Sequence, residues 1–135
     1  MNKICTTIEQ SKKLIELGID VNTADMHYYK NSFGDYIEGL YNSSDLKEGF
    51  ELKGIEYIPA WSLSALLELI PPYLGEFNEG IDFGFSKSMN KKWYSAHYIQ
   101  LNDDGVATFN KTVTGDTAID AAFKMVVWLK ENNKI

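Results

Sequence analysis

The spacing of apolar positions predicts three helices along the chain. Residues 7–17 follow a capping signal built on threonines and precede Gly18, a residue type that commonly ends helices. Residues 61–70 carry leucine and isoleucine at helical spacing and stop at two prolines, which cannot continue a helix. Residues 116–132 form the clearest helix, because their apolar stripe is wider than a surface helix needs.

Segments that alternate with a period of two lie between these helices and are predicted as strands. Residues 26–29 and 35–37 read as a short hairpin. A three-stranded meander then begins at Phe83 and ends at Val113, with a strong turn signal over residues 102–105. The short connections within the meander imply antiparallel neighbours.

The strand over residues 93–101 decides the expected architecture. Its two faces carry, on one side, Trp93, Ser95, His97, Ile99 and Leu101 and, on the other, Tyr94, Ala96, Tyr98 and Gln100. Neither face is clearly polar, whereas a half-solvated sheet alternates cleanly. We therefore expect helices on both sides of a small antiparallel sheet, or helices on one side and a partner subunit on the other. With no internal repeat or linker, residues 1–135 are expected to form a single α+β domain.

The net charge of the chain limits the kinds of partner that it is expected to bind. The 135 residues carry a net charge of −6 and include no arginine, although phosphates are usually bound by clustered basic residues and by arginine in particular. A nucleic-acid partner is therefore not expected. Acidic residues gather between Asp35 and Glu56, where we expect a solvated face and, over residues 42–49, a loop.

The compartment follows from what the sequence lacks. Cys5 is the only cysteine, so an intramolecular disulfide is excluded, and we assign this residue no role. The N-terminal residues do not resemble a signal peptide, and no segment approaches the roughly 20 apolar residues of a membrane span. We expect a cytoplasmic protein without membrane association.

Several stretches resemble a known family, namely residues 9–18, 23–26, 58–63 and 120–129. Together they look like a family of small proteins from gut Bacteroidetes and their phages or mobile elements. The order of helix, sheet and closing helix is also loosely similar to the phage ABA sandwich domain. The resemblance implies a bacterial or phage setting and an α+β fold. It implies no activity and no site residues.

The two histidines supply the first candidate site residues. Asp25 and His27 would share one face of a strand, so the carboxylate could orient the imidazole as a base or support it as a metal ligand. His97 lies beside Ser95 on its strand face, a pair that could act as base and nucleophile. Because no nucleophile elbow or third catalytic group accompanies them, we mainly expect structural roles for both histidines.

Other patterns point to no cofactor and no metal. Zinc needs three or four ligands, and the cysteine and the two histidines are widely scattered. The glycine-containing segments match no nucleotide-binding pattern. One cluster interleaves lysines with aromatic residues, as single-strand nucleic-acid platforms do: Lys91, Lys92, Trp93 and Tyr94.

The sequence therefore favours a binding or interaction module over an enzyme, with no catalytic residues assigned. Its expected partner is a second copy of the chain or another protein. One alternative is a small enzyme whose pocket gathers Asp25, His27 and His97. Another is a weak binder of single-stranded nucleic acid through residues 91–94. The candidate binding residues are Asp25, His27, Trp93, Tyr94 and His97.

Overall fold

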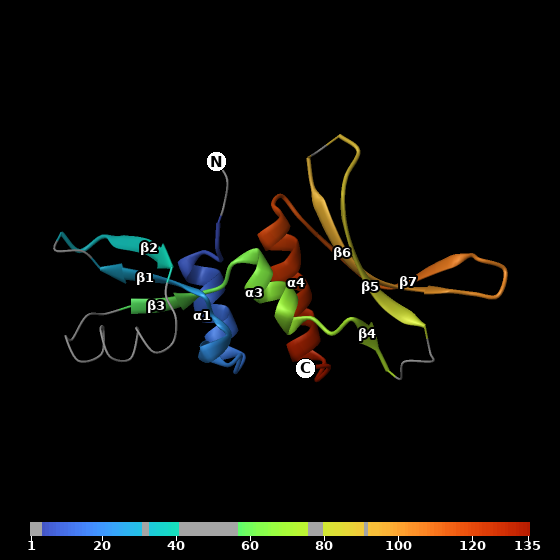
Figure 1. The fold of residues 1–135 in the computed structure, drawn as a ribbon, viewed down its shortest axis with the longest axis horizontal. Coiled ribbons are helices and arrows are strands. Elements are labelled where there is room, and N and C mark those ends of the chain that lie inside the picture. The colour runs from blue at the N-terminus through green and yellow to red at the C-terminus, as the bar shows by residue number, and fades with distance from the viewer. Residues whose placement is uncertain (1–3, 31–32, 41–56, 76–79, 91) are drawn as a thin grey trace. The chain divides into compact units, whose positions relative to one another are not determined.

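The structure is a computed structural model that describes residues 4–30, 33–40, 57–75, 80–90 and 92–135. These residues form helices and two antiparallel sheets, so the predicted α+β class and the closing helix are confirmed (Figure 1). The chain divides into two compact units, Met1–Ala65 and Leu66–Ile135. The expectation of one domain stays a prediction, and the loop predicted over residues 42–49 lies outside the described residues.

The described part of the first unit contains a three-stranded sheet in the order β2-β1-β3. The elements are α1 (Ile8–Glu16), the 3-10 helix η1 (Val21–Thr23), β1 (Met26–Lys30), β2 (Tyr36–Leu40) and β3 (Tyr57–Ala60). The predicted hairpin is β1 and β2, which pair antiparallel. Strand β3 was not predicted, because Pro59 interrupts its pattern. A proline is tolerated there since β3 is an edge strand of this sheet.

Helix α1 begins where the sequence indicates. Thr7 is its N-cap, and the capping box with Gln10 is complete, because each side chain accepts a hydrogen bond from the other residue's backbone. Thr6 has a different role: its hydroxyl lies 2.7 Å from the Ser11 hydroxyl and accepts a hydrogen bond from the backbone N–H of Trp61. Gly18 follows the helix with a φ of 90°, as predicted for a residue that ends it.

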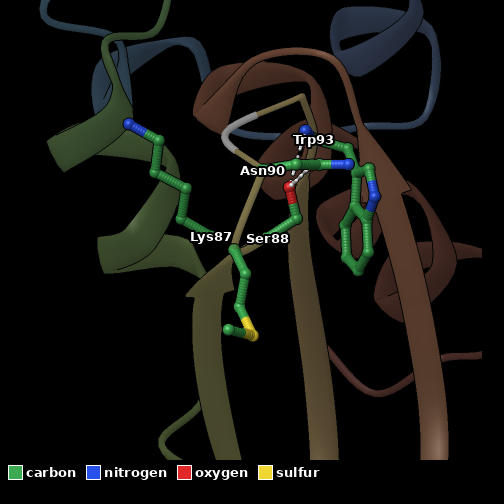
Figure 2. Close-up of a pocket in the computed structure, with 5 residues that line it drawn as sticks. Lys87, Ser88, Asn90 and Trp93 are labelled. Atoms are coloured by element: carbon green, nitrogen blue, oxygen red, sulfur yellow. Dashed lines mark hydrogen bonds between the residues drawn. The ribbon is translucent and has the colours of Figure 1, made fainter.

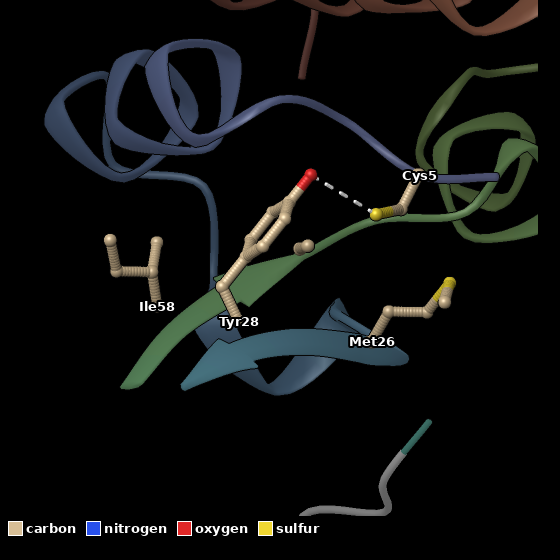
Figure 3. Close-up of a cluster of buried hydrophobic side chains, with 5 residues drawn as sticks. Cys5, Met26, Tyr28 and Ile58 are labelled. Atoms are coloured by element: carbon tan, nitrogen blue, oxygen red, sulfur yellow. Dashed lines mark hydrogen bonds between the residues drawn. The ribbon is translucent and has the colours of Figure 1, made fainter. Parts of the chain in front are cut away.

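Side chains from β1, β3 and the N-terminal segment form the core of the first unit (Figure 3). The cluster consists of Cys5, Met26, Tyr28, Ile58 and Ala60. The Cys5 thiol donates a hydrogen bond to the Tyr28 hydroxyl, which in turn donates to the backbone carbonyl of Thr6. Cys5 is thus a buried packing residue in this structure, a common environment for a free cysteine.

The second unit holds a four-stranded sheet in the order β4-β5-β6-β7. Helix α3 (Leu63–Leu69) crosses the boundary between the units, and the elements that follow are β4 (Tyr73–Leu74), β5 (Ile81–Lys87), β6 (Tyr94–Leu101), β7 (Ala107–Gly115) and α4 (Ala118–Glu131). Strands β5 to β7 are the predicted meander. The strands of the N-terminal hairpin do not join it; they belong to the separate sheet of the first unit.

Helix α4 packs on one face of this sheet, against β6 and β7. That face carries Ala96 and Tyr98, which are fully buried, and the Tyr98 hydroxyl donates to the carbonyl of Pro71. The opposite face carries exposed Trp93 and Phe109. Within the described residues of this unit, a helix covers one face of the sheet, which agrees with the second of the two expected arrangements. The partner subunit on the other face stays a prediction.

Candidate functional site

The face of the sheet opposite α4 contains a hollow of about 400 Å³, which we call the open-face groove. Strands β5, β6 and β7 supply its floor, because antiparallel pairing places Ser86, Ser95 and Thr114 in one row and His97 and Thr112 in the next. The groove is lined by Ser86, Trp93, Ser95, His97, Ile99, Phe109, Thr112 and Thr114. The volume lies within the range of small-molecule sites.

The imidazole of His97 occupies the middle of the floor. Its Nδ1 lies 3.1 Å from the Ser95 hydroxyl, and its ring meets Phe109 edge-on, with 5.5 Å between the ring centroids. The Nε2 edge of the ring covers Gly84, because a Cβ at that position would lie 2.4 Å from Nε2. Glycine in a strand interior is unfavourable, and here it makes room for the histidine.

A short chain of hydroxyl groups holds His97 in place. The Ser86 and Ser95 hydroxyls lie 3.3 Å apart, and Ser95 then contacts His97 Nδ1. Burial lowers the pKa of His97 below its usual 6.5, so the imidazole is neutral at pH 7. A neutral imidazole has one donor and one acceptor nitrogen. Within the described residues the structure gives Nδ1 a partner and gives Nε2 none.

Two exposed aromatic side chains also line the groove. The side chain of Trp93 is 43% exposed, and that of Phe109 is 59% exposed. Phe109 reaches this face because of a register shift between β6 and β7: Tyr98 pairs with Lys111, but the next residue, Ile99, pairs with Phe109. The extra residue of such a bulge reverses the alternation that follows it. Without the bulge, Phe109 would belong to the face that α4 covers.

A second hollow, of about 440 Å³, lies at the hairpin between β5 and β6 (Figure 2). Its described lining is Lys87, Ser88, Met89, Asn90 and Trp93. The Ser88 hydroxyl organises this hairpin, since it accepts hydrogen bonds from the backbone N–H groups of Lys92 and Trp93 and donates to the Asn90 side chain. The hairpin thereby fixes the backbone from which the Trp93 side chain enters the open-face groove.

The structure brings together two of the residues singled out from the sequence, Trp93 and His97. It places Tyr94 on the other face of β6, where its ring contacts Phe85 and the Lys87 ammonium. Trp93 and Tyr94 therefore do not form one stacking surface. Lys91 lies outside the described residues.

Asp25 and His27 belong to the first unit. The Asp25 carboxylate accepts hydrogen bonds from both the backbone N–H and the hydroxyl of Ser62, the residue that precedes α3. His27 lies on β1, is almost fully buried and packs its ring near Tyr29. Since His97 belongs to the second unit, a pocket shared by Asp25, His27 and His97 stays a prediction.

Sequence reasoning missed Phe109, Thr112 and Gly84 as parts of the site. Only Gly84 gives a local signal, because an isolated glycine between two phenylalanines in a strand marks a close approach of another group. Phe109 gives no local sequence signal, because the bulge that turns it toward His97 depends on the pairing of β6 with β7.

The described residues also bear on two further features, a metal site and a membrane-spanning helix. Among them, no group of three or more histidine, cysteine or acidic side chains could hold a metal ion. No helix in this part of the chain is both long enough and apolar enough to cross a membrane.

Comparisons with models of known protein families, with curated proteins and with solved structures find no match to this chain.

Proposed function

We propose that this protein is a binding protein without catalytic activity and that its ligand occupies the open-face groove. The observation that carries the proposal is the groove itself, which is lined by two exposed aromatic side chains and by a histidine that contacts the Ser95 hydroxyl. Mostly apolar hollows with a few well-placed polar groups are the usual form of a ligand site. The family resemblance leads us to place this role in a bacterial or phage setting.

The main alternative is an enzyme that uses Ser95 and His97 as nucleophile and base. Their contact of 3.1 Å satisfies the first requirement of such a pair. A third group must then orient the imidazole, and none of the side chains that line the groove is a carboxylate. Nε2, where such a group would bind if Ser95 uses Nδ1, instead covers Gly84. We therefore favour binding over catalysis.

A screen of uncharged small organic compounds by thermal shift tests the proposal. Compounds that raise the melting temperature of the wild-type protein should lose this effect in Phe109→Ala, which removes one wall of the groove. Phe33→Ala is the matched control, because Phe33 is 88% exposed and lies in the first unit. Stabilisation that persists in Phe109→Ala, or hydrolysis of ester substrates that depends on His97, would overturn the proposal.

A further inference from the structure

We infer that the ligand of the open-face groove is a flat, uncharged nitrogen heterocycle of the nucleobase type, an inference that rests on the function proposed above. Charge is the first argument. The eight lining residues include no lysine and no acidic residue, and burial keeps His97 neutral at pH 7. An ionised ligand would lose its hydration without gaining an opposite charge.

The exposed rings are the second argument. Trp93 and Phe109 both line the groove, and both side chains are exposed. A flat ring can cover such a surface by stacking, which contributes about 1–3 kcal/mol per nucleobase in single-strand binding proteins. A saturated ring or a linear chain covers the same surface without the stacking term.

The polar groups are the third argument. His97 Nε2 and the hydroxyls of Thr112 and Thr114 have no hydrogen-bond partner among the described residues. Each of the hydroxyls can donate or accept, and the imidazole offers one or the other according to its tautomer. Groups of this kind suit the edge of a heterocycle, where donors and acceptors alternate in one plane. The groove holds no amide or carboxylate that could grip neighbouring hydroxyls of a sugar.

The groove suits the ring of a nucleobase and does not suit the phosphate backbone of a nucleic acid. A phosphate would need lysine or arginine beside the ring. The one described lysine of the neighbouring hollow is Lys87, and its ammonium lies 5.4 Å from the centre of the Tyr94 ring, on the face away from the groove. Figure 2 shows the Lys87 and Trp93 side chains on opposite sides of the hairpin. The net charge of −6 also disfavours an anionic ligand.

Titrations followed by amide NMR test this inference with named probes. Adenine and uracil are the heterocycles, and methyl glucoside, hexanol and adenosine monophosphate are the comparison ligands. We expect at least one base to bind, and Phe109→Ala to weaken its binding by about fivefold or more, the loss of one stacking partner. Thr112→Val, which keeps the shape but removes a hydroxyl, should also weaken it. Phe33→Ala should leave it unchanged.

The outcomes separate this inference from the proposed function. Binding of methyl glucoside or hexanol in the groove, with neither base binding, would overturn the ligand class and leave the binding function intact. No response to any probe would contradict both. Tighter binding of adenosine monophosphate than of adenine would also overturn the inference, since it would require a phosphate site. So would sedimentation showing a dimer that Phe109→Ala dissociates, because a second copy would then occupy the groove.

Discussion

Gly84 and His97 act as a coupled pair in the second unit. They face each other on neighbouring strands, and the imidazole takes the space that any side chain at position 84 would need. Ser95 and Phe109 contact the imidazole from other sides, so it cannot move away without losing those contacts. The groove floor therefore keeps its shape only if position 84 is a glycine, which has no Cβ to displace the His97 ring.

Replacing Gly84 by alanine should destabilise the protein, by about 1–3 kcal/mol, because the new methyl group overlaps the His97 ring. Alanine is otherwise the better strand residue, so the loss should shrink or reverse when His97 is replaced by alanine as well. Urea unfolding of the two single variants and the double variant measures this coupling. Equal losses with and without His97 would show that the two residues are independent.

The two histidines should make stability depend on pH. Burial lowers the pKa of both His27 and His97 from 6.5. Below pH 6.5 the unfolded chain therefore binds more protons than the folded chain, and the free energy of unfolding falls as the pH drops from 7 toward 5. Urea unfolding at both pH values checks the sign. His97→Gln should reduce the difference, and a stability that rises toward pH 5 would contradict the pKa directions.

At the scale of elements, the sequence predicts best what is locally encoded. The start of α1 follows from Thr7 and Gln10, and α4 begins after its cap Thr117, at the start of the predicted range 116–132. The turn after β6 also follows from local chemistry, because Asn102 accepts two backbone hydrogen bonds and Gly105 has a φ of 80°. Strand β3 and the bulge opposite Tyr98 depend on pairing with distant segments, and neither could be predicted.

The hairpin between β5 and β6 should control the position of Trp93. Ser88→Ala removes the acceptor for the backbone N–H groups of Lys92 and Trp93. We expect greater mobility of the Trp93 side chain, seen in its NMR relaxation, with only a small change in melting temperature because these hydrogen bonds are exposed. Ser64→Ala, at an exposed position of α3, is the control. A Trp93 side chain as rigid as in the wild type would show that Ser88 does not hold it.

At the scale of the whole molecule, only part of the candidate site could be predicted from the sequence. His97 and Trp93 stand out as unusual residues on one strand face, and they meet in the groove. Their environment comes from β5 and β7, which no local pattern connects to them. The acidic balance of the chain, by contrast, is a global property that the sequence shows directly.

The most direct measurement is a map of the amide shifts that adenine causes in the full chain. We expect shifts concentrated on β5, β6 and β7, strongest at Trp93, His97, Phe109 and Thr112, with a matching change in the His97 ring signals. Shifts confined to the sheet of the first unit, or none at all with adenine or uracil, would contradict the assignment of the open-face groove as a binding site for such a ring.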